Sequence, residues 1–309
     1  MPRFYTFITS LLISAFLITC NPKTSQPDEA KGLEAEPEVQ EEGSGDQVSL
    51  FGMDNLLAWC IVPFDSNKRS PEKRIMMLKE LGFQSYAYDW RNEHLAEMEK
   101  ELKLAAENEV EVKAVWLWID ANSDGPGKLS AANEKMLSII KNSGLHTQVW
   151  VGFHANYFDG MSDEEAVRNG IEMVRYLGNR AAEIGCQLAL YNHGDWFGEP
   201  ANQVKIIEKL PDLDIGIIYN FHHAHGQIIR LPEIINVMKP YLWVVNLNGM
   251  RKEGPKILPL GTGDQEKKMI DLFIEAGYTG PWGILGHVED ADVQKILEAN
   301  LKGLKSLYE

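Results

Sequence analysis

The sequence of 309 residues has few cysteines, no excess of basic residues and no apolar run long enough to cross a membrane. Three cysteines are too few for a disulfide framework. Thirty Lys and Arg stand against 45 Asp and Glu, a net charge of −15, and this argues against nucleic acid as a partner, because phosphate backbones are bound by clustered basic side chains. A composition of 44% hydrophobic and 24% charged residues is typical of a folded domain and excludes collagen-like, disordered and multi-span membrane proteins.

The amino-terminal segment MPRFYTFITSLLISAFLITC carries Arg3 and then an apolar run over 11–18. This run is shorter than the roughly 20 residues of a transmembrane helix and is typical of a secretory signal. It ends in the sequence LITC at 17–20, which resembles a bacterial lipobox; a plain signal peptide with a chance cysteine is the alternative. We expect residues 1–19 to be a lipoprotein signal peptide. Lipidation at Cys20 would then anchor the exported protein to a bacterial membrane, at the periplasmic face or the cell surface.

Residues 20–49 form the next region. From position 21 they hold eight acidic residues, two lysines, three prolines and almost no large apolar side chain. Such a segment cannot bury enough surface to offset the entropy lost on ordering. We therefore expect a disordered acidic tether, followed by one folded domain over 50–309.

Eight short apolar runs, each followed by a segment with helical character, occupy the remainder of the chain. Continuous apolar runs without alternation are typical of strands covered on both faces. Eight such units in one chain predict a (β/α)8 TIM barrel, an α/β single domain, and the alternative of an open doubly wound sheet lacks a G-x-G-x-x-G motif after its first strand. The runs are centred on 57–64, 85–90, 112–119, 147–153, 187–192, 214–220, 242–248 and 282–286.

The expected helices carry start and stop signals. Ser70-Pro71-Glu72 and Ser162-Asp163-Glu164-Glu165 are typical helix starts. Glycines that stand just before the next strand are typical helix terminators in the left-handed conformation. These glycines are Gly82, Gly144, Gly185 and Gly277.

Histidines gather after the predicted strands. In a barrel of this kind the loops at the carboxyl ends of the strands build the active site. At most two of His222, His223 and His225 should line a pocket, because neighbours on an extended segment face opposite ways. Seven of the eight histidines follow a strand: His94, His154, His193, His222, His223, His225 and His287.

Other polar and aromatic residues end the same strands. Imidazole and amide groups can ligate a divalent metal, transfer a proton near neutral pH or bind sugar hydroxyls. We expect His193, His223 and Asp89 to be catalytic. Trp90, Trp118 and Trp196 near the mouth could stack on a pyranose. For the tryptophans of the third run, Trp116 and Trp118, packing between helix and sheet is the favoured alternative. The expected substrate-binding residues are Asn192, Trp196, Asn220, Asn246, Asn248, Trp90 and His154.

At these residues the chain resembles the xylose-isomerase-like barrel superfamily of sugar isomerases and epimerases, over about 55–308. In that family, carboxylates and a histidine at the ends of strands five to eight hold a divalent metal, and two glutamates move a proton beside a sugar carbonyl. Asn192, His193 and His223 match the family pattern. Tyr191 stands in place of a glutamate and Asn220 in place of an aspartate. Asn246 stands in place of a histidine, and the last glutamate is missing.

The loss of three carboxylates would weaken a site for Mg²⁺ or Mn²⁺, which prefer oxygen ligands. A set of His193, His223 and His287 would favour Zn²⁺, Fe²⁺ or Ni²⁺. We therefore expect a rebuilt divalent-metal site (Zn, Fe, Ni or Mn) at these three histidines. The alternative is that the histidines act directly as bases without a metal.

The segment Leu260-Gly261-Thr262-Gly263-Asp264 precedes an expected helix. Its backbone amides could bind an anion, or Asp264 could be the helix N-cap. Sugar phosphates are scarce outside the cytoplasm, so the expected substrate is an unphosphorylated carbohydrate.

The sequence and the resemblance together predict an isomerase- or epimerase-like enzyme that removes a proton next to a sugar carbonyl, with the help of a metal as in its superfamily. Two alternatives remain: a lyase or hydratase that acts on 3-keto-glycosides by β-elimination, and a non-catalytic sugar-binding lipoprotein. A DNA-repair nuclease of the same superfamily is opposed by the expected export and the net acidity. The expected partners are a small carbohydrate and, through the lipid, a membrane, and the oligomeric state stays open.

Overall fold

The structure, a computed structural model, describes residues 50–309. The expected signal peptide, the tether and the lipidation site Cys20 all lie outside the described residues.

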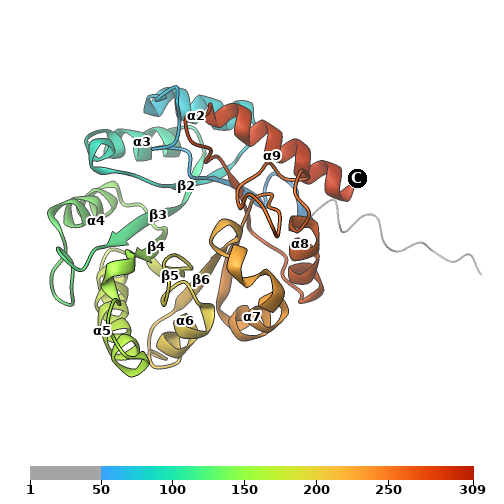
Figure 1. The fold of residues 1–309 in the computed structure, drawn as a ribbon. Coiled ribbons are helices and arrows are strands. Elements are labelled where there is room, and N and C mark those ends of the chain that lie inside the picture. Colours follow the sequence, from blue (N-terminus) through green and yellow to red (C-terminus); the bar gives the residue numbers. More distant parts are fainter. Residues whose placement is uncertain (1–49) are drawn as a thin grey trace, which may run out of the picture. The chain divides into compact units, whose positions relative to one another are not determined.

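Eight parallel strands form a closed barrel in which each strand pairs with the next along the chain and the last pairs with the first (Figure 1). The predicted TIM barrel is therefore confirmed, and each of the eight apolar runs contains one strand. The strands are β1 (Leu56–Trp59), β2 (Ser85–Tyr88), β3 (Glu111–Ile119), β4 (Gln148–Phe153), β5 (Gln187–Tyr191), β6 (Ile215–Asn220), β7 (Leu242–Leu247) and β8 (Trp282–Leu285).

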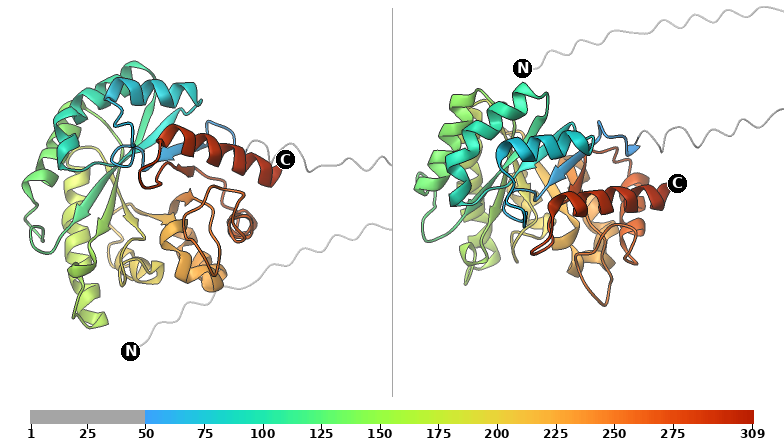
Figure 2. Two further views of the ribbon diagram at one scale, coloured as in Figure 1. Left: turned by 45° about the horizontal axis from the view of Figure 1, so that its top comes forward. Right: turned by 90° about the horizontal axis from the view of Figure 1, so that it is seen from above.

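Helices surround the strands on the outside, as both views of Figure 2 show. Each packs an apolar face against the sheet, so the strands are covered from within and from without. The α-helices are α2 (Pro71–Glu80), α3 (Leu95–Glu107), α4 (Ala131–Ser143), α5 (Asp163–Ala182), α6 (Pro200–Ile207), α7 (Leu231–Met238), α8 (Glu266–Glu275) and α9 (Val293–Tyr308). Short 3₁₀ turns are η1 (Asn92–His94), η2 (Ala155–Tyr157), η3 (Phe221–His223), η4 (His225–Arg230) and η5 (Lys239–Tyr241).

The helix signals lie where the sequence predicts, although the side chain of Ser70 at the start of α2 makes no capping hydrogen bond. Ser162 and Glu165 form a reciprocal capping box at the start of α5. All four terminator glycines have positive φ, between 66° and 85°. These glycines turn the chain from each helix into the following strand.

The inside of the barrel is aromatic. Small inward residues on some strands, such as Ala87 and Ala114, make room for large ones on others, such as Trp59 and Trp150. Trp116 is buried in this inner cluster and Trp118 packs against it. Both point into the barrel, so the favoured expectation that they lie between helix and sheet is wrong. The position of Trp118 agrees with the alternative that places it near the mouth, and its contact with a sugar stays a prediction.

Within residues 50–309 no helix is both long and apolar enough to cross a membrane.

Candidate functional site

An open cavity of about 780 Å³ lies at the carboxyl ends of β2 to β5. It occupies the end of the barrel where the loops after the strands meet, as expected for this fold. Its lining combines two indoles, two imidazoles and many polar groups. The lining residues are Trp90, Arg91, Asn92, Glu93, Trp118, Asp120, Ser123, Asp124, Ser130, Ala132, Asn133, His154 and His193.

His193, which follows β5, is the half-buried imidazole of this cavity. Its Nδ1 lies 3.2 Å from the carbonyl oxygen of Phe153, which can only accept, so Nδ1 carries the proton. Nε2 is then left with a free lone pair. Burial lowers the pKa of His193, so the ring is neutral near pH 7 and can accept a proton.

His223 lies directly behind His193, with ring centroids 4.6 Å apart and planes nearly perpendicular. Its Nε2 lies 3.0 Å from the hydroxyl of Tyr191, the residue that stands at the family's glutamate position. Burial lowers the pKa of His223, and the neighbouring rings of His222 and His193 lower it further. The predicted catalytic pair of His193 and His223 is thus brought together, but His223 does not line the large cavity.

His222 also turns inward, because the chain after β6 forms the 3₁₀ turn η3 instead of continuing as an extended strand. Its ring lies 3.6 Å from that of His223 and stacks on Trp59 at 5.8 Å. Burial lowers the pKa of His222 to about 3. His225 instead points away, donating from Nε2 to the carbonyl of Arg251 at 2.8 Å.

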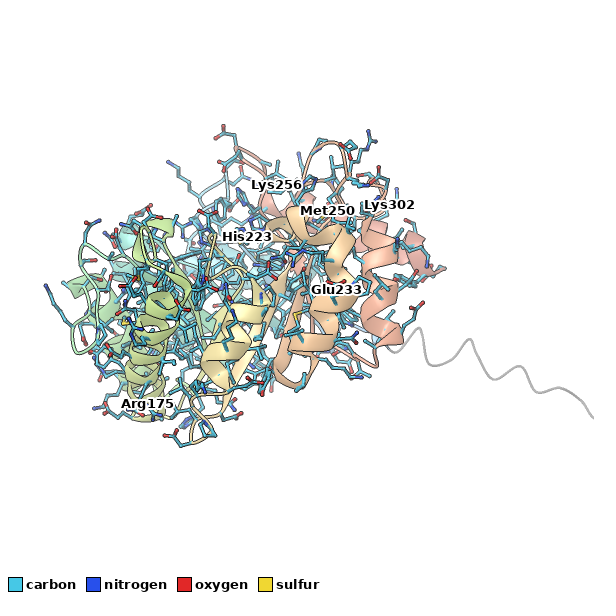
Figure 3. All side chains as sticks on the ribbon, turned by 60° about the horizontal axis from the view of Figure 1, so that its bottom comes forward. Arg175, His223, Glu233, Met250, Lys256 and Lys302 are labelled. Carbon is cyan, nitrogen blue, oxygen red and sulfur yellow. The ribbon has the colours of Figure 1, made fainter. Side chains whose placement is uncertain are left out.

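A hairpin after β7 lies beside the histidines. It is closed by a bridge between Gly249 and Leu258 and held to the strand end by Asn248, whose amide donates to the carbonyl of Lys256 at 2.8 Å. Figure 3 shows His223 and Lys256 at one end of the barrel and Arg175 at the other. The Lys256 ammonium lowers the pKa of His193, His222 and His223, after larger contributions from burial.

Trp118 forms one wall of the cavity beside His193. The two rings are 4.7 Å apart and nearly perpendicular. Gly152 on β4 leaves the space for this indole, since a methyl group at Gly152 would lie 2.5 Å from Cζ3 of Trp118. The sequence names Trp118 as a candidate stacking residue but does not decide its direction, because both faces of β3 are apolar and show no alternation.

The other predicted aromatic residues divide between two places. Trp90 lines the cavity, held by a 2.7 Å hydrogen bond from Nε1 to the carbonyl of Trp116. His154 also lines it and lies 5.8 Å from Trp118. Trp196 lies outside it, at an adjoining pocket of about 50 Å³ that shares His154 and His193 with the cavity, and its Nε1 donates to Asp163.

Asp89 is fully buried at the end of β2. Its Oδ1 accepts hydrogen bonds from the amides of Ile61 and Val62 at 3.1 and 3.2 Å, so it fixes the loop after β1. Burial raises the pKa of Asp89 to about 6. Because its carboxylate does not line the cavity, a direct catalytic role for Asp89 stays a prediction.

The four predicted asparagines are buried, and the side chains of two of them, Asn192 and Asn248, bind other parts of the protein. Asn192 clamps the backbone of Asn220 through both ends of its amide, at 2.7 and 3.2 Å. Asn220 and Asn246 are register partners inside the barrel, and their amides make no hydrogen bond within the described chain. Asn248 holds the hairpin. None of the four lines the cavity, so their contact with substrate stays a prediction.

The expected metal centre of His193, His223 and His287 is not assembled. His222 stands between the pair and His287, whose ring stacks on Phe64 at 3.6 Å and whose Nε2 pairs with Glu289 at 2.9 Å. Across residues 50–309 no three His, Cys, Asp or Glu side chains are arranged to hold one ion. The three predicted ligands are therefore not gathered around one point within residues 50–309, and a divalent metal stays a prediction.

The loop before α8 is neither an anion site nor capped by Asp264. The buried carboxylate of Glu266 accepts from the amides of Gly263, Met250 and Gln265 at 2.8 to 3.3 Å. These are the amides that an external anion would need. The N-cap of α8 is Gln265, and Asp264 accepts from the amide of Lys252.

The sequence model of the xylose isomerase-like TIM barrel family matches residues 77–307. The chain belongs to this family. No curated protein sequence matches it.

Several solved structures share the fold at low sequence identity. The 3-keto-D-glucoside 4-epimerase from E. coli is 14% identical, with a TM-score of 0.59 over 82% of this chain and 98% of that one. D-psicose 3-epimerase, crystallised in the presence of D-fructose, is 14% identical, with a TM-score of 0.58 over 81% and 97%. The IolI protein, which contains a bound zinc atom, is 11% identical, with a TM-score of 0.62 over 82% and 97%.

Proposed function

We propose that this protein is a sugar isomerase or epimerase in which His193 removes a proton from the carbon next to a carbonyl. The observation that carries the proposal is the state of His193: Nδ1 is fixed by the Phe153 carbonyl, the ring is held neutral by burial, and the residue lines an open cavity. A neutral imidazole with one free lone pair is the form that a general base requires.

Trp118 can position the sugar for proton removal, and Arg91 can stabilise the negative charge that develops. A sugar whose apolar face rests on Trp118 lies beside His193, because the two rings are 4.7 Å apart. As the C–H bond breaks, its proton goes to Nε2 and its electron pair moves toward the carbonyl oxygen, which gains negative charge. Arg91 lines the same cavity and is fixed by a 2.8 Å hydrogen bond to the Trp90 carbonyl, so its guanidinium can stabilise that charge.

The fate of the proton decides the reaction. Return to the neighbouring carbon is isomerisation, and return to the opposite face of the same carbon is epimerisation. Loss of a β-substituent instead gives the lyase reaction on a 3-keto-glycoside, which shares the first step. Support for this second candidate comes from similar solved structures that include a 3-keto-D-glucoside 4-epimerase and a probable 3-DHS dehydratase.

Solvent deuterium exchange tests the shared step. We expect deuterium at the carbon next to the carbonyl, or an elimination product, from an unphosphorylated keto-sugar. His193→Gln should slow the reaction by about 10²–10⁴-fold, the usual contribution of a general base. His146→Gln is the matched control, since His146 precedes β4 and bonds Gly185 away from the cavity. Exchange at the parent rate in His193→Gln would refute the assignment, and sugar binding without exchange or elimination would favour the non-catalytic binder.

We also propose that the protein is exported and anchored through lipid on Cys20, as the amino-terminal sequence suggests. Cys20→Ser should move the protein from the membrane fraction to the soluble fraction, whereas Cys186→Ser, at a buried thiol of the barrel, should not. Membrane association of Cys20→Ser equal to that of the parent would contradict this proposal.

A further inference from the structure

The cavity extends well beyond the reacting group that it contains. At about 780 Å³ it lies in the upper part of the range of about 300–1,000 Å³ that holds drug-sized ligands. A single hexose resting on Trp118 beside His193 fills only the inner part. The outer part runs over the loop after β2 and the loop between β3 and α4.

The floor of this outer part is already fixed by internal hydrogen bonds. Asp124 accepts from the Ser130 amide at 2.7 Å and from the Asn133 side chain at 3.0 Å. Asn133 also donates to the Trp118 carbonyl at 2.8 Å. The outer floor and the Trp118 wall are thus one connected network. Because this network is already ordered, the protein loses little conformational freedom when a ligand that spans both parts binds.

The charge of the outer part selects among possible ligands. Glu93, Asp120 and Asp124 contribute three carboxylates to the lining, against the single guanidinium of Arg91. A second negatively charged unit would meet net repulsion there, whereas hydroxyl groups find both donors and acceptors.

We propose that the substrate is a neutral disaccharide or glycoside, with its reacting unit between Trp118 and His193 and its second unit over the loop between β3 and α4. The proposal rests on the proposed function for the identity of the reacting unit. It adds the size and the charge of the remainder of the substrate.

The test measures binding by the intact protein through quenching of tryptophan fluorescence, with Trp90 and Trp118 as reporters. The probes are neutral disaccharides, the monosaccharides that compose them, and disaccharides that end in a uronate. We expect at least one neutral disaccharide to bind tenfold or more tightly than either of its monosaccharides, and more tightly than its uronate counterpart at low salt.

Ala132→Phe fills the outer part from the first turn of α4. It should abolish the preference for the disaccharide, so that the disaccharide and its monosaccharides bind with similar affinity. Ala131→Phe, at an exposed neighbour outside the lining, is the matched control, and the melting temperatures of both variants verify folding.

The inference is overturned if no disaccharide binds more tightly than its monosaccharides, if nothing in the panel binds, or if Ala132→Phe keeps the preference. If a monosaccharide exchanges deuterium and a second sugar unit does not increase the rate, the proposed function stands and only this inference is rejected. A disaccharide preference without exchange or elimination would reject the enzymatic proposal and leave the two-unit site.

Discussion

Replacing Gly152 with alanine should displace the Trp118 indole. A methyl group at Gly152 would lie 2.5 Å from Cζ3 and 2.9 Å from Cε3 of Trp118, far inside van der Waals contact. Trp118 cannot move deeper into the barrel, because Trp116 and Tyr191 lie at 6.4 and 5.8 Å on its inner side. The indole must therefore shift toward the cavity and toward His193.

The expected cost has two parts. Overpacking a filled core costs about 1–3 kcal/mol, which at about 2–4 °C per kcal/mol lowers the melting temperature by about 2–12 °C. A shift of about 1 Å in a positioning group can cost about 10²-fold in rate. Gly125→Ala is the control, since a methyl group there meets no atom within 4 Å. Thermal melts and deuterium exchange measure the two parts, and a Gly152→Ala protein that melts and reacts like the parent would refute the role given to Trp118.

Three further predictions concern buried groups. Glu101→Gln leaves the buried guanidinium of Arg74 without its ionic partner, and urea unfolding should show a loss of about 3–5 kcal/mol; an unchanged midpoint would contradict this. Tyr191→Phe removes the hydroxyl 3.0 Å from Nε2 of His223, so we expect a loss of about 1–3 kcal/mol and a changed ¹⁵N shift of that ring, and an unaltered spectrum would argue against the contact. His222 has a pKa of about 3 in the folded protein against about 6.5 in the unfolded chain. Its ring is neutral in both states above pH 6.5, so it adds no pH dependence there. Below pH 6.5 only the unfolded chain binds the proton, and the free energy of unfolding falls by about 1.4 kcal/mol per pH unit. Unfolding at pH 7, 6 and 5 should show a shallower dependence for His222→Asn than for the parent, and equal slopes would refute the assignment.

The fold could be predicted from the sequence because its signals are local. An apolar run of strand length and a glycine that ends a helix, such as Gly144 before β4, depend on a few neighbouring residues. The closure of the barrel follows from the number of such units. The direction of a side chain within a fully buried strand has no such signal, and for this reason the sequence leaves open whether Trp118 lies at the mouth or between helix and sheet.

The site could be located but not assembled from the sequence. The histidines after the strands do mark the correct end of the barrel, with His193 in the cavity. The predicted metal site needs His193, His223 and His287 to surround one ion. One 3₁₀ turn after Asn220 brings His222 in beside His223, and His222 then separates His287 from the other two. Such a turn depends on tertiary packing, here the stack of His222 on Trp59.

The two halves of the barrel mouth differ in what they leave open. Over β6 to β8 and β1 the space is filled by imidazoles stacked on aromatic rings, as His287 is on Phe64, and by the hairpin that Asn248 holds. Over β2 to β5 it is open, and His193 stands at the boundary. If the proposed function holds, we expect a substrate to meet His193 from the open half and His223, which lies behind it, to act through it. Substitutions in the open half should change substrate affinity directly, whereas those in the packed half should act on rate and pH dependence through the position and protonation of His193.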